Sequence, residues 1–229
     1  MATEKWERTF DDPPFVQGVL ERPRGEPEAA IVLTHGASGN FDQPLLIALA
    51  QAFTARGVAA LRVNMAYRQR GRGAPGPATA SQDRLSLRRA ADGLRSEVCP
   101  RVYLGGSSYG GRQASMLLAD DPEAAEALLL LSYPLHPPGR PEQLRTEHLP
   151  RVRTPTFLAH GTKDAFGSIE ELEAAALSLP GPHELLAFEG LSHGLSPRRK
   201  DPKELEAVAE KICVGFLAFV GKEVRAAAE

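Results

Sequence analysis

One ten-residue run, 102–111 (VYLGGSSYGG), constrains the fold more than any other part of the chain. A short apolar segment ends there in the pattern Gly-x-Ser-x-Gly, and a helix-compatible stretch from Arg112 to Ala119 follows. That order predicts a strand, a sharp turn and a helix, with one serine held in a strained conformation where the strand ends. The spacing selects Ser108, because Gly106 and Gly110 flank it, and glycines without Cβ atoms let strand and helix approach closely.

A serine hydroxyl becomes a good nucleophile only beside a base that is itself oriented by an acid, and the downstream sequence offers both. The apolar run 156–159 predicts a buried strand, and Asp164 follows it. The run 184–188 predicts another strand, and His193 lies in the glycine-flanked loop after it. Because the carboxyl ends of parallel strands meet at one edge of a sheet, we expect Ser108, Asp164 and His193 to lie close together.

Other titratable residues fit these roles less well. Glu189 is the alternative acid, because it lies close to His193 in the chain. Asp120 and Asp121 end the helix after Ser108, which places them at the wrong edge of the sheet. The remaining histidines either end predicted strands, where they shape loops (His35 and His160), or fit no triad position (His136, His148 and His183).

A loop upstream predicts a fourth component of the site. The β-rich run 30–34 ends in His35-Gly36-Ala37, and backbone amides in such a loop can stabilise negative charge on a carbonyl oxygen. The residue after the serine usually contributes a second amide. We therefore expect an oxyanion hole from the backbone N–H groups of Ala37 and Tyr109. Since Tyr109 would act through its main chain, its side chain is expected to matter less.

Arginines and aromatic residues near this edge are candidates for substrate binding. The loop 67–75 carries three arginines among glycines. Two interpretations remain open: an anion clamp, in which Arg70 and Arg72 bind carboxylate or phosphate, or a solvated loop, which is favoured. Arg112, on the helix after Ser108, is expected to cap that helix or to form a structural pair. The other candidates are His35, Gly36 and Tyr133, and for Tyr133 packing is an equally good interpretation.

Apolar runs alternate with helical spacings along the chain, which predicts an α/β fold with a mostly parallel, doubly wound sheet and helices on both faces. Helices are expected over 43–56, 81–96, 168–179 and 203–220, strands over 58–63 and 127–131, and a loop over 64–80. Two short extended pieces, 6–10 and 15–20, predict an antiparallel edge. We expect one domain over 1–229 without a large cap, although the segment between 131 and 155 can fold over the site.

Composition narrows the partners. The formal net charge of −2 gives no global field that would favour nucleic acid or an anionic membrane. No apolar run approaches the ~20 residues of a membrane helix, and the first residues lack a signal-peptide core, so we expect a cytoplasmic protein. Cys99 and Cys213 have no metal-like spacing and are expected to be buried thiols, so neither metal nor cofactor is predicted. The oligomeric state stays open.

Five segments together resemble a known family: 34–40, 105–115, 131–150, 160–167 and 190–195. They look like those of small, lidless, dienelactone-hydrolase-like α/β-hydrolases, and more closely like the hydrolase-like domain shared by the Tex and KANL proteins. The segment 131–150 is the most specific of the five. The resemblance implies Ser108, Asp164 and His193 as a catalytic triad, and it implies no particular substrate.

These patterns predict a metal-free serine hydrolase that cleaves an ester, a thioester or a related acyl bond of a small molecule through an acyl-enzyme. A peptidase or amidase would use the same triad, so the sequence does not separate the two. The other alternative is a non-catalytic, hydrolase-like scaffold or binding protein, since fold does not fix function. Three catalytic groups in the required order disfavour the scaffold.

Overall fold

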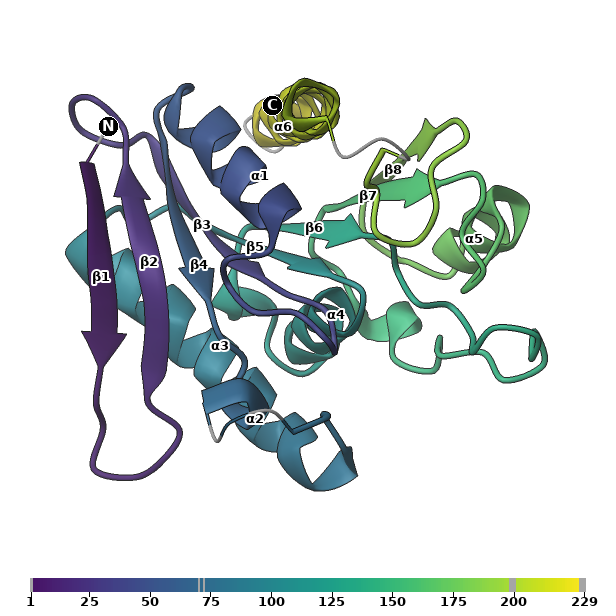
Figure 1. Cartoon of the computed structure of the whole chain (residues 1–229), viewed down its shortest axis with the longest axis horizontal. Helices are drawn as coiled ribbons and strands as arrows, with labels where there is room; N and C mark the ends of the chain where they lie inside the picture. The colour runs from purple at the N-terminus through teal and green to yellow at the C-terminus, as the bar shows by residue number, and fades with distance from the viewer. Residues whose placement is uncertain (1, 70, 72, 198–200, 227–229) are drawn as a thin grey trace.

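The computed structural model describes residues 2–69, 71, 73–197 and 201–226. A sheet of eight strands runs through it in the order β1-β2-β4-β3-β5-β6-β7-β8 (Figure 1). The strands are β1 (Ala2–Arg8), β2 (Val16–Arg22), β3 (Ala29–Thr34), β4 (Val58–Val63), β5 (Val102–Ser107), β6 (Ala127–Leu131), β7 (Thr156–Gly161) and β8 (His183–Phe188). From β4 to β8 neighbouring strands are parallel, whereas β1 and β2 form the expected antiparallel edge.

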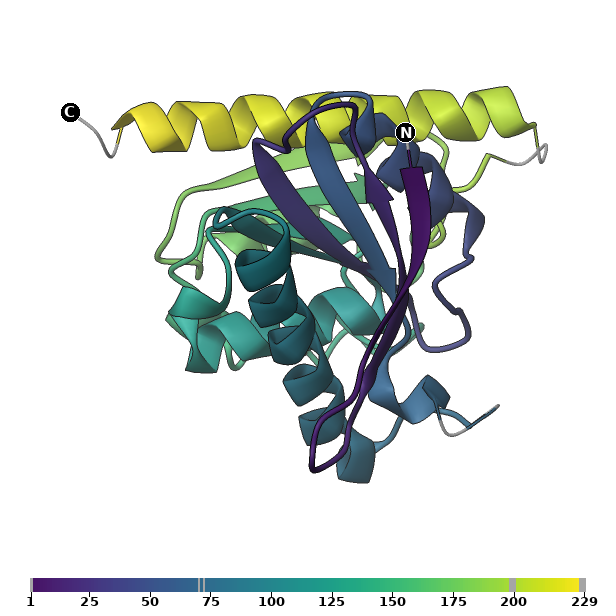
Figure 2. The ribbon, with the colours of Figure 1, turned by 90° about the vertical axis from the view of Figure 1, so that its left-hand side faces the viewer.

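Helices cover both faces of this sheet, which confirms the doubly wound α/β prediction (Figures 1 and 2). One face carries α1 (Pro44–Thr54) and the long α6 (Pro202–Ala226), and the other carries α3 (Pro77–Glu97), α4 (Tyr109–Asp120) and α5 (Ile169–Ala176). The shorter helices are α2 (Ala66–Gln69), η1 (Pro122–Ala124) and η2 (Leu149–Arg151).

The strands in the middle of the sheet are buried on both faces, as their continuous apolar sequences require. In β3, Val32 faces the core beneath α3 and α4, whereas Ile31 and Leu33 face the core beneath α1 and α6. Phe216 of α6 fills the second core, with its ring centroid 5.4 Å from that of Tyr103. The sheet is thus held between two apolar layers, and the loops at its carboxyl edge rest on a fixed base.

The observed boundaries differ from the predicted ones where the apolar signal is weak. β1 begins at Ala2 and ends at Arg8, not over 6–10, because only Trp6 of this exposed edge strand is buried. Within the predicted loop 64–80, the structure has α2 and the first turn of α3. Pro77 starts α3 directly after Gly76, because a proline at the first helical position needs no amide partner.

Residues 132–155 connect β6 and β7 and contain only η2, so the described part of the chain has no separate cap domain. No helix in the described ranges is long and apolar enough to cross a membrane. Those ranges also hold no group of three or more His, Cys, Asp or Glu residues that could bind a metal ion. Cys99 and Cys213 are buried free thiols, as predicted.

Candidate active site

Ser108 lies in a sharp turn between β5 and α4. Its backbone has φ 50° and ψ −116°, a conformation that residues other than glycine rarely adopt and that matches the predicted strained turn. The flanking glycines make the turn possible. A Cβ atom at Gly106 would lie 2.4 Å from the amide nitrogen of Gly111, and one at Gly110 would lie 2.5 Å from the carbonyl oxygen of His35. The close approach expected from the motif is therefore present on both sides of Ser108.

His193 and Asp164 meet Ser108 in hydrogen-bonded order. His193 Nε2 lies 2.7 Å from Ser108 Oγ, and His193 Nδ1 lies 2.8 Å from one carboxylate oxygen of Asp164 and 3.0 Å from the other. Because a carboxylate only accepts, Nδ1 carries the proton and Nε2 is left to accept from the serine hydroxyl. Three loops, after β5, β7 and β8, thus bring together residues that are far apart in the sequence.

Asp164 is held rigidly at the back of this arrangement. Its side chain is fully buried, and its carboxylate also accepts a hydrogen bond from the backbone amide of Phe166 at 2.8 Å. The ring of Phe166 stacks on the imidazole of His193, with the centroids 4.0 Å apart. Phe166 therefore fixes both the acid and the base. The alternative acid, Glu189, is exposed.

The two residues predicted to form an oxyanion hole lie at one cavity. Ala37 and Tyr109 line one cavity with Ser108. The Tyr109 amide is the first of α4, a position that lacks an acceptor within the helix, and no hydrogen bond within the described residues engages the amide of Ala37. Both donors are therefore available to a ligand oxygen beside Ser108.

A buried network holds these two amides in place. Asp83 of α3 accepts from the Tyr109 hydroxyl at 2.6 Å and from the Tyr67 backbone amide at 2.9 Å. The Tyr67 hydroxyl in turn donates to the carbonyl oxygen of Ala37 at 2.8 Å. Burial raises the pKa of Tyr67 to about 12, so this hydroxyl keeps its proton. The side chain of Tyr109, which was expected to matter little, therefore has a structural role.

The cavity beside Ser108 has a volume of about 620 Å3 and is open to solvent on one side. Its walls come from the loop after β3, the starts of α3 and α4, and the segment between β6 and β7. The lining residues are Ala37, Pro75, Gly76, Pro77, Ala80, Ser108, Tyr109, Arg112, Gln113, Pro134, Arg145 and Phe166. The connecting segment 132–155 thus reaches over the site, and it contributes Arg145, which the sequence did not suggest.

The structure does not place all the predicted substrate-binding residues at the cavity. His35 is fully buried, with Nδ1 against Gly36 O at 2.8 Å and Nε2 accepting from the Met65 amide at 3.2 Å, so it shapes its loop and does not line the cavity. Tyr133 is also buried, and its hydroxyl donates to the Arg145 carbonyl at 2.6 Å. Their side chains are used for packing because both stand at strand ends beneath the loops.

Gly36 lies next to the nucleophile, since a Cβ atom there would lie 3.3 Å from the Cβ of Ser108. Arg70 and Arg72, the proposed anion clamp, lie outside the described residues. The structural pair expected for Arg112 does not occur within the described ranges, where its Nε is buried without a hydrogen-bond partner.

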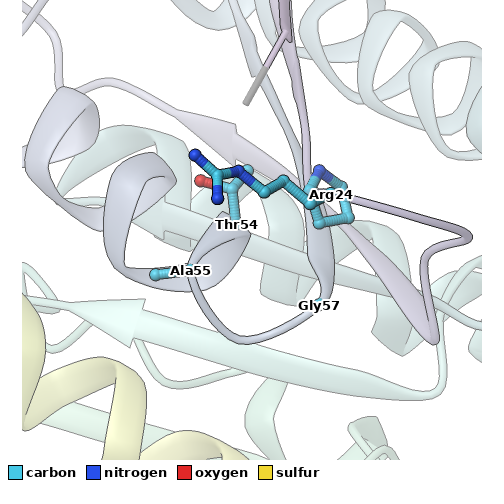
Figure 3. Close-up of a pocket in the computed structure, with 5 residues that line it drawn as sticks. Arg24, Thr54, Ala55 and Gly57 are labelled. Atoms are coloured by element: carbon cyan, nitrogen blue, oxygen red, sulfur yellow. The ribbon is translucent and has the colours of Figure 1, made fainter.

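A second hollow, of about 280 Å3, lies between the end of β2 and the end of α1 (Figure 3). Arg24, Thr54, Ala55 and Gly57 line it, and Gly57 directly precedes β4. It therefore lies at the amino ends of the parallel strands, away from Ser108. The Thr54 hydroxyl donates to the Ala50 carbonyl of its own helix at 2.9 Å.

A comparison with known protein families identifies the family of this chain. A sequence profile described as an alpha/beta hydrolase domain matches residues 27–221. The chain belongs to the alpha/beta hydrolase family. The matched range contains Ser108, Asp164 and His193 and all strands from β3 to β8. This confirms the predicted relationship to α/β-hydrolases, and the protein is a hydrolase.

Solved structures of esterases and of a dienelactone hydrolase share the fold of this hydrolase over almost its whole length. They are Est1E from Butyrivibrio proteoclasticus (16% identity, 95% of this chain and 99% of that chain, TM-score 0.74), a dienelactone hydrolase from Anabaena variabilis ATCC 29413 (22%, 95% and 97%, 0.73) and the esterase domain of a Rhodothermus marinus protein (17%, 96% and 100%, 0.70). At these identities the likeness shows the fold alone.

Two buried histidines of the hydrolase predict a loss of stability in acid. Burial is the main cause that lowers the pKa of His35 and that of His148, to about 4 in each case. The positive charge of Arg68 lowers the pKa of His35 further, and that of Arg112 lowers the pKa of His148 further. The unfolded chain, with histidine pKa values near 6.5, binds protons that the folded state does not. The stability is therefore complete above pH 6.5 and falls toward pH 4, by about 3 kcal/mol for each histidine.

Urea unfolding at pH 7, 6 and 5 measures this slope. In His148→Gln, we expect the free energy of unfolding to fall less steeply than in the wild type as the pH is lowered. The difference in slope should be up to about 1.4 kcal/mol per pH unit. The matched control is His183→Gln, since His183 is exposed. An identical slope in wild type and His148→Gln would contradict the assignment.

Proposed function

We propose that this hydrolase cleaves esters or thioesters of small molecules through a covalent acyl-enzyme on Ser108. The observation that carries the proposal is the 2.7 Å contact of Ser108 Oγ with His193 Nε2, in line with the buried Asp164 carboxylate. This is the arrangement in which a serine hydroxyl is activated, because the base can take its proton during attack. A dead scaffold would not need all three groups.

In the proposed reaction, Ser108 Oγ attacks the carbonyl carbon while its proton passes to His193 Nε2. Asp164 orients the imidazole and stabilises its positive charge. The backbone amides of Ala37 and Tyr109 donate to the oxygen that becomes negative. Collapse of the tetrahedral intermediate expels the alcohol or thiol, which receives the proton from His193. Water then attacks the acyl-enzyme, with His193 again as the base, and the acid is released.

The test combines labelling with turnover. The folded protein is incubated with a fluorophosphonate and with a panel of 4-nitrophenyl esters, acyl thioesters and 4-nitroanilides. We expect one adduct by intact-protein mass spectrometry, mapped to Ser108, and turnover of esters or thioesters. Turnover of the anilides alone would instead favour a peptidase or amidase. Neither adduct nor turnover, in protein that is folded by circular dichroism, would contradict the proposal and favour a non-catalytic role. A cytoplasmic location stays a prediction.

A further inference from the structure

Two arginines line the same cavity as Ser108, and neither pairs with a carboxylate of the described residues. Two other arginines with largely buried side chains are neutralised by carboxylates. Arg62 lies 3.0 Å from Glu21, and Arg89 lies 2.8 Å from Asp12. Arg112 and Arg145 have no such carboxylate partner within the described residues, and both line the cavity beside Ser108.

Arg112 is fixed one helical turn from the nucleophile. Its backbone amide donates to the carbonyl oxygen of Ser108 at 3.0 Å, and the side chain leaves α4 on the cavity side. Its Nε is buried and has no hydrogen-bond partner. An unpartnered charged donor in such a position costs free energy, because it has lost water without gaining an acceptor. No hydrogen bond within the described residues engages the rest of its guanidinium group either, so its other donors are available to an anion in the cavity.

Arg145 reaches the cavity from the connection between β6 and β7, and both its amide and its carbonyl are hydrogen-bonded. Its amide donates to the Leu135 carbonyl at 2.8 Å, and its carbonyl accepts from the Tyr133 hydroxyl at 2.6 Å. One guanidinium nitrogen donates to the Pro134 carbonyl at 3.3 Å, which leaves the other donors for a ligand. Burial and the nearby charge of Arg112 both lower the pKa of Arg145.

Of the groups around the pair, Arg84 adds positive charge, whereas the carboxylates of Asp83 and Asp120 bond other partners. Arg84 donates to the side-chain oxygen of Gln113, which also lines the cavity, at 3.1 Å. His148 hydrogen-bonds Ser115 at 2.8 Å, and burial lowers its pKa to about 4, so it is neutral at pH 7. The carboxylate of Asp120 is taken up by Arg151. The walls of this cavity therefore favour a ligand that carries its own negative charge.

We propose that Arg112 and Arg145 form an anion subsite beside Ser108, and that the substrate of this hydrolase carries a carboxylate or phosphate group in addition to its scissile acyl bond. This rests on the proposed function, since it specifies the substrate class for the same site. Two guanidinium groups that line one cavity would hold one anionic group through charge-assisted hydrogen bonds. The anion would fix the distance from the charged end of the substrate to the carbonyl carbon that Ser108 attacks.

Matched esters test the subsite. The free acid of mono-4-nitrophenyl glutarate is compared with its methyl-capped, neutral ester. In the wild type we expect kcat/KM to favour the acid by about 10- to 100-fold, the range expected for charge-assisted hydrogen bonds. Arg145→Gln and Arg112→Gln should each reduce that preference by about 10-fold or more. Arg145→Lys, which keeps the charge and loses the planar fork, should restore part of it.

Arg151→Gln is the matched control, because Arg151 is exposed, lies in the same connecting segment and, among the described residues, pairs with surface Asp120 alone. It should leave the preference unchanged. Competition by glutarate and by inorganic phosphate then separates the two sources of the anion. Equal use of the acid and the capped ester by the wild type, or an unchanged preference in both glutamine variants, would overturn the proposal.

A binding measurement separates this proposal from the failure of catalysis. Ser108→Ala protein is titrated with glutarate and with phosphate in a thermal-unfolding assay. An increase in Tm that disappears when Arg145→Gln is added, but not when Arg151→Gln is added, would support the anion subsite even in a protein that turns over no ester. No increase with either anion, together with no preference for the acid, would leave the subsite refuted.

Discussion

Replacing Ser108 with alanine is expected to abolish the fluorophosphonate adduct and to lower kcat by on the order of 10^4- to 10^6-fold, because the group that forms the covalent bond is removed. The fold should stay intact, because alanine is smaller than serine and the Ser108 hydroxyl hydrogen-bonds only His193 in the described structure. Intact-protein mass spectrometry and steady-state hydrolysis of a 4-nitrophenyl ester measure the two effects, and circular dichroism checks the fold.

The neighbouring serine provides the control. Ser107→Ala removes an adjacent hydroxyl at the end of β5, where the spacing of the glycines does not select it. This variant should keep the adduct and most of the activity. Persistent labelling of Ser108→Ala, or loss of labelling in Ser107→Ala alone, would show that the assigned serine is the wrong one.

The second large effect is expected for Asp164→Asn, with a loss of kcat on the order of 10^4-fold. The amide group of asparagine donates toward His193 Nδ1, which favours the tautomer with its proton on Nε2. With its proton on Nε2, His193 cannot accept the proton of Ser108, even though Nε2 lies 2.7 Å from Ser108 Oγ in the wild type. Because asparagine has nearly the shape of aspartate, KM should change far less than kcat.

Glu189→Gln is the natural comparison, since Glu189 is the other carboxylate close to His193 in the chain and is exposed. It should leave kcat within a few-fold of the wild type. If the two variants lost activity equally, or if Glu189→Gln lost more, the acid would have been assigned to the wrong residue.

Much of the fold follows from local sequence patterns. The strands β3 to β7 are continuous apolar runs that are buried on both faces, so their patterns carry strong signals. The order of Ser108, Asp164 and His193 after three such strands predicts their meeting, because parallel strands deliver their carboxyl ends to one edge. The edge strand β1 was placed less well, since burial there involves Trp6 alone.

The walls of the site depend on contacts that no local pattern encodes. Asp83 lies 26 residues before Tyr109, in the middle of a helix, and nothing in its neighbourhood marks it as the acceptor for that hydroxyl. Arg145 and Phe166 reach the cavity through connections whose paths follow from packing. Arg112 was expected to cap its helix or to pair structurally, and none of the described residues provides a carboxylate partner for it.

The Asp83 network also bears on how such a chain can change over generations. Asp83 is completely buried and joins α4, which begins directly after Ser108, to the loop that contains Ala37, through Tyr109 and Tyr67. A mutation of Tyr109 to phenylalanine would deprive a buried carboxylate of a donor, which is costly until Asp83 changes as well. Descendants of this sequence should therefore keep the tyrosine and the aspartate together or lose them together, so that positions 83 and 109 covary.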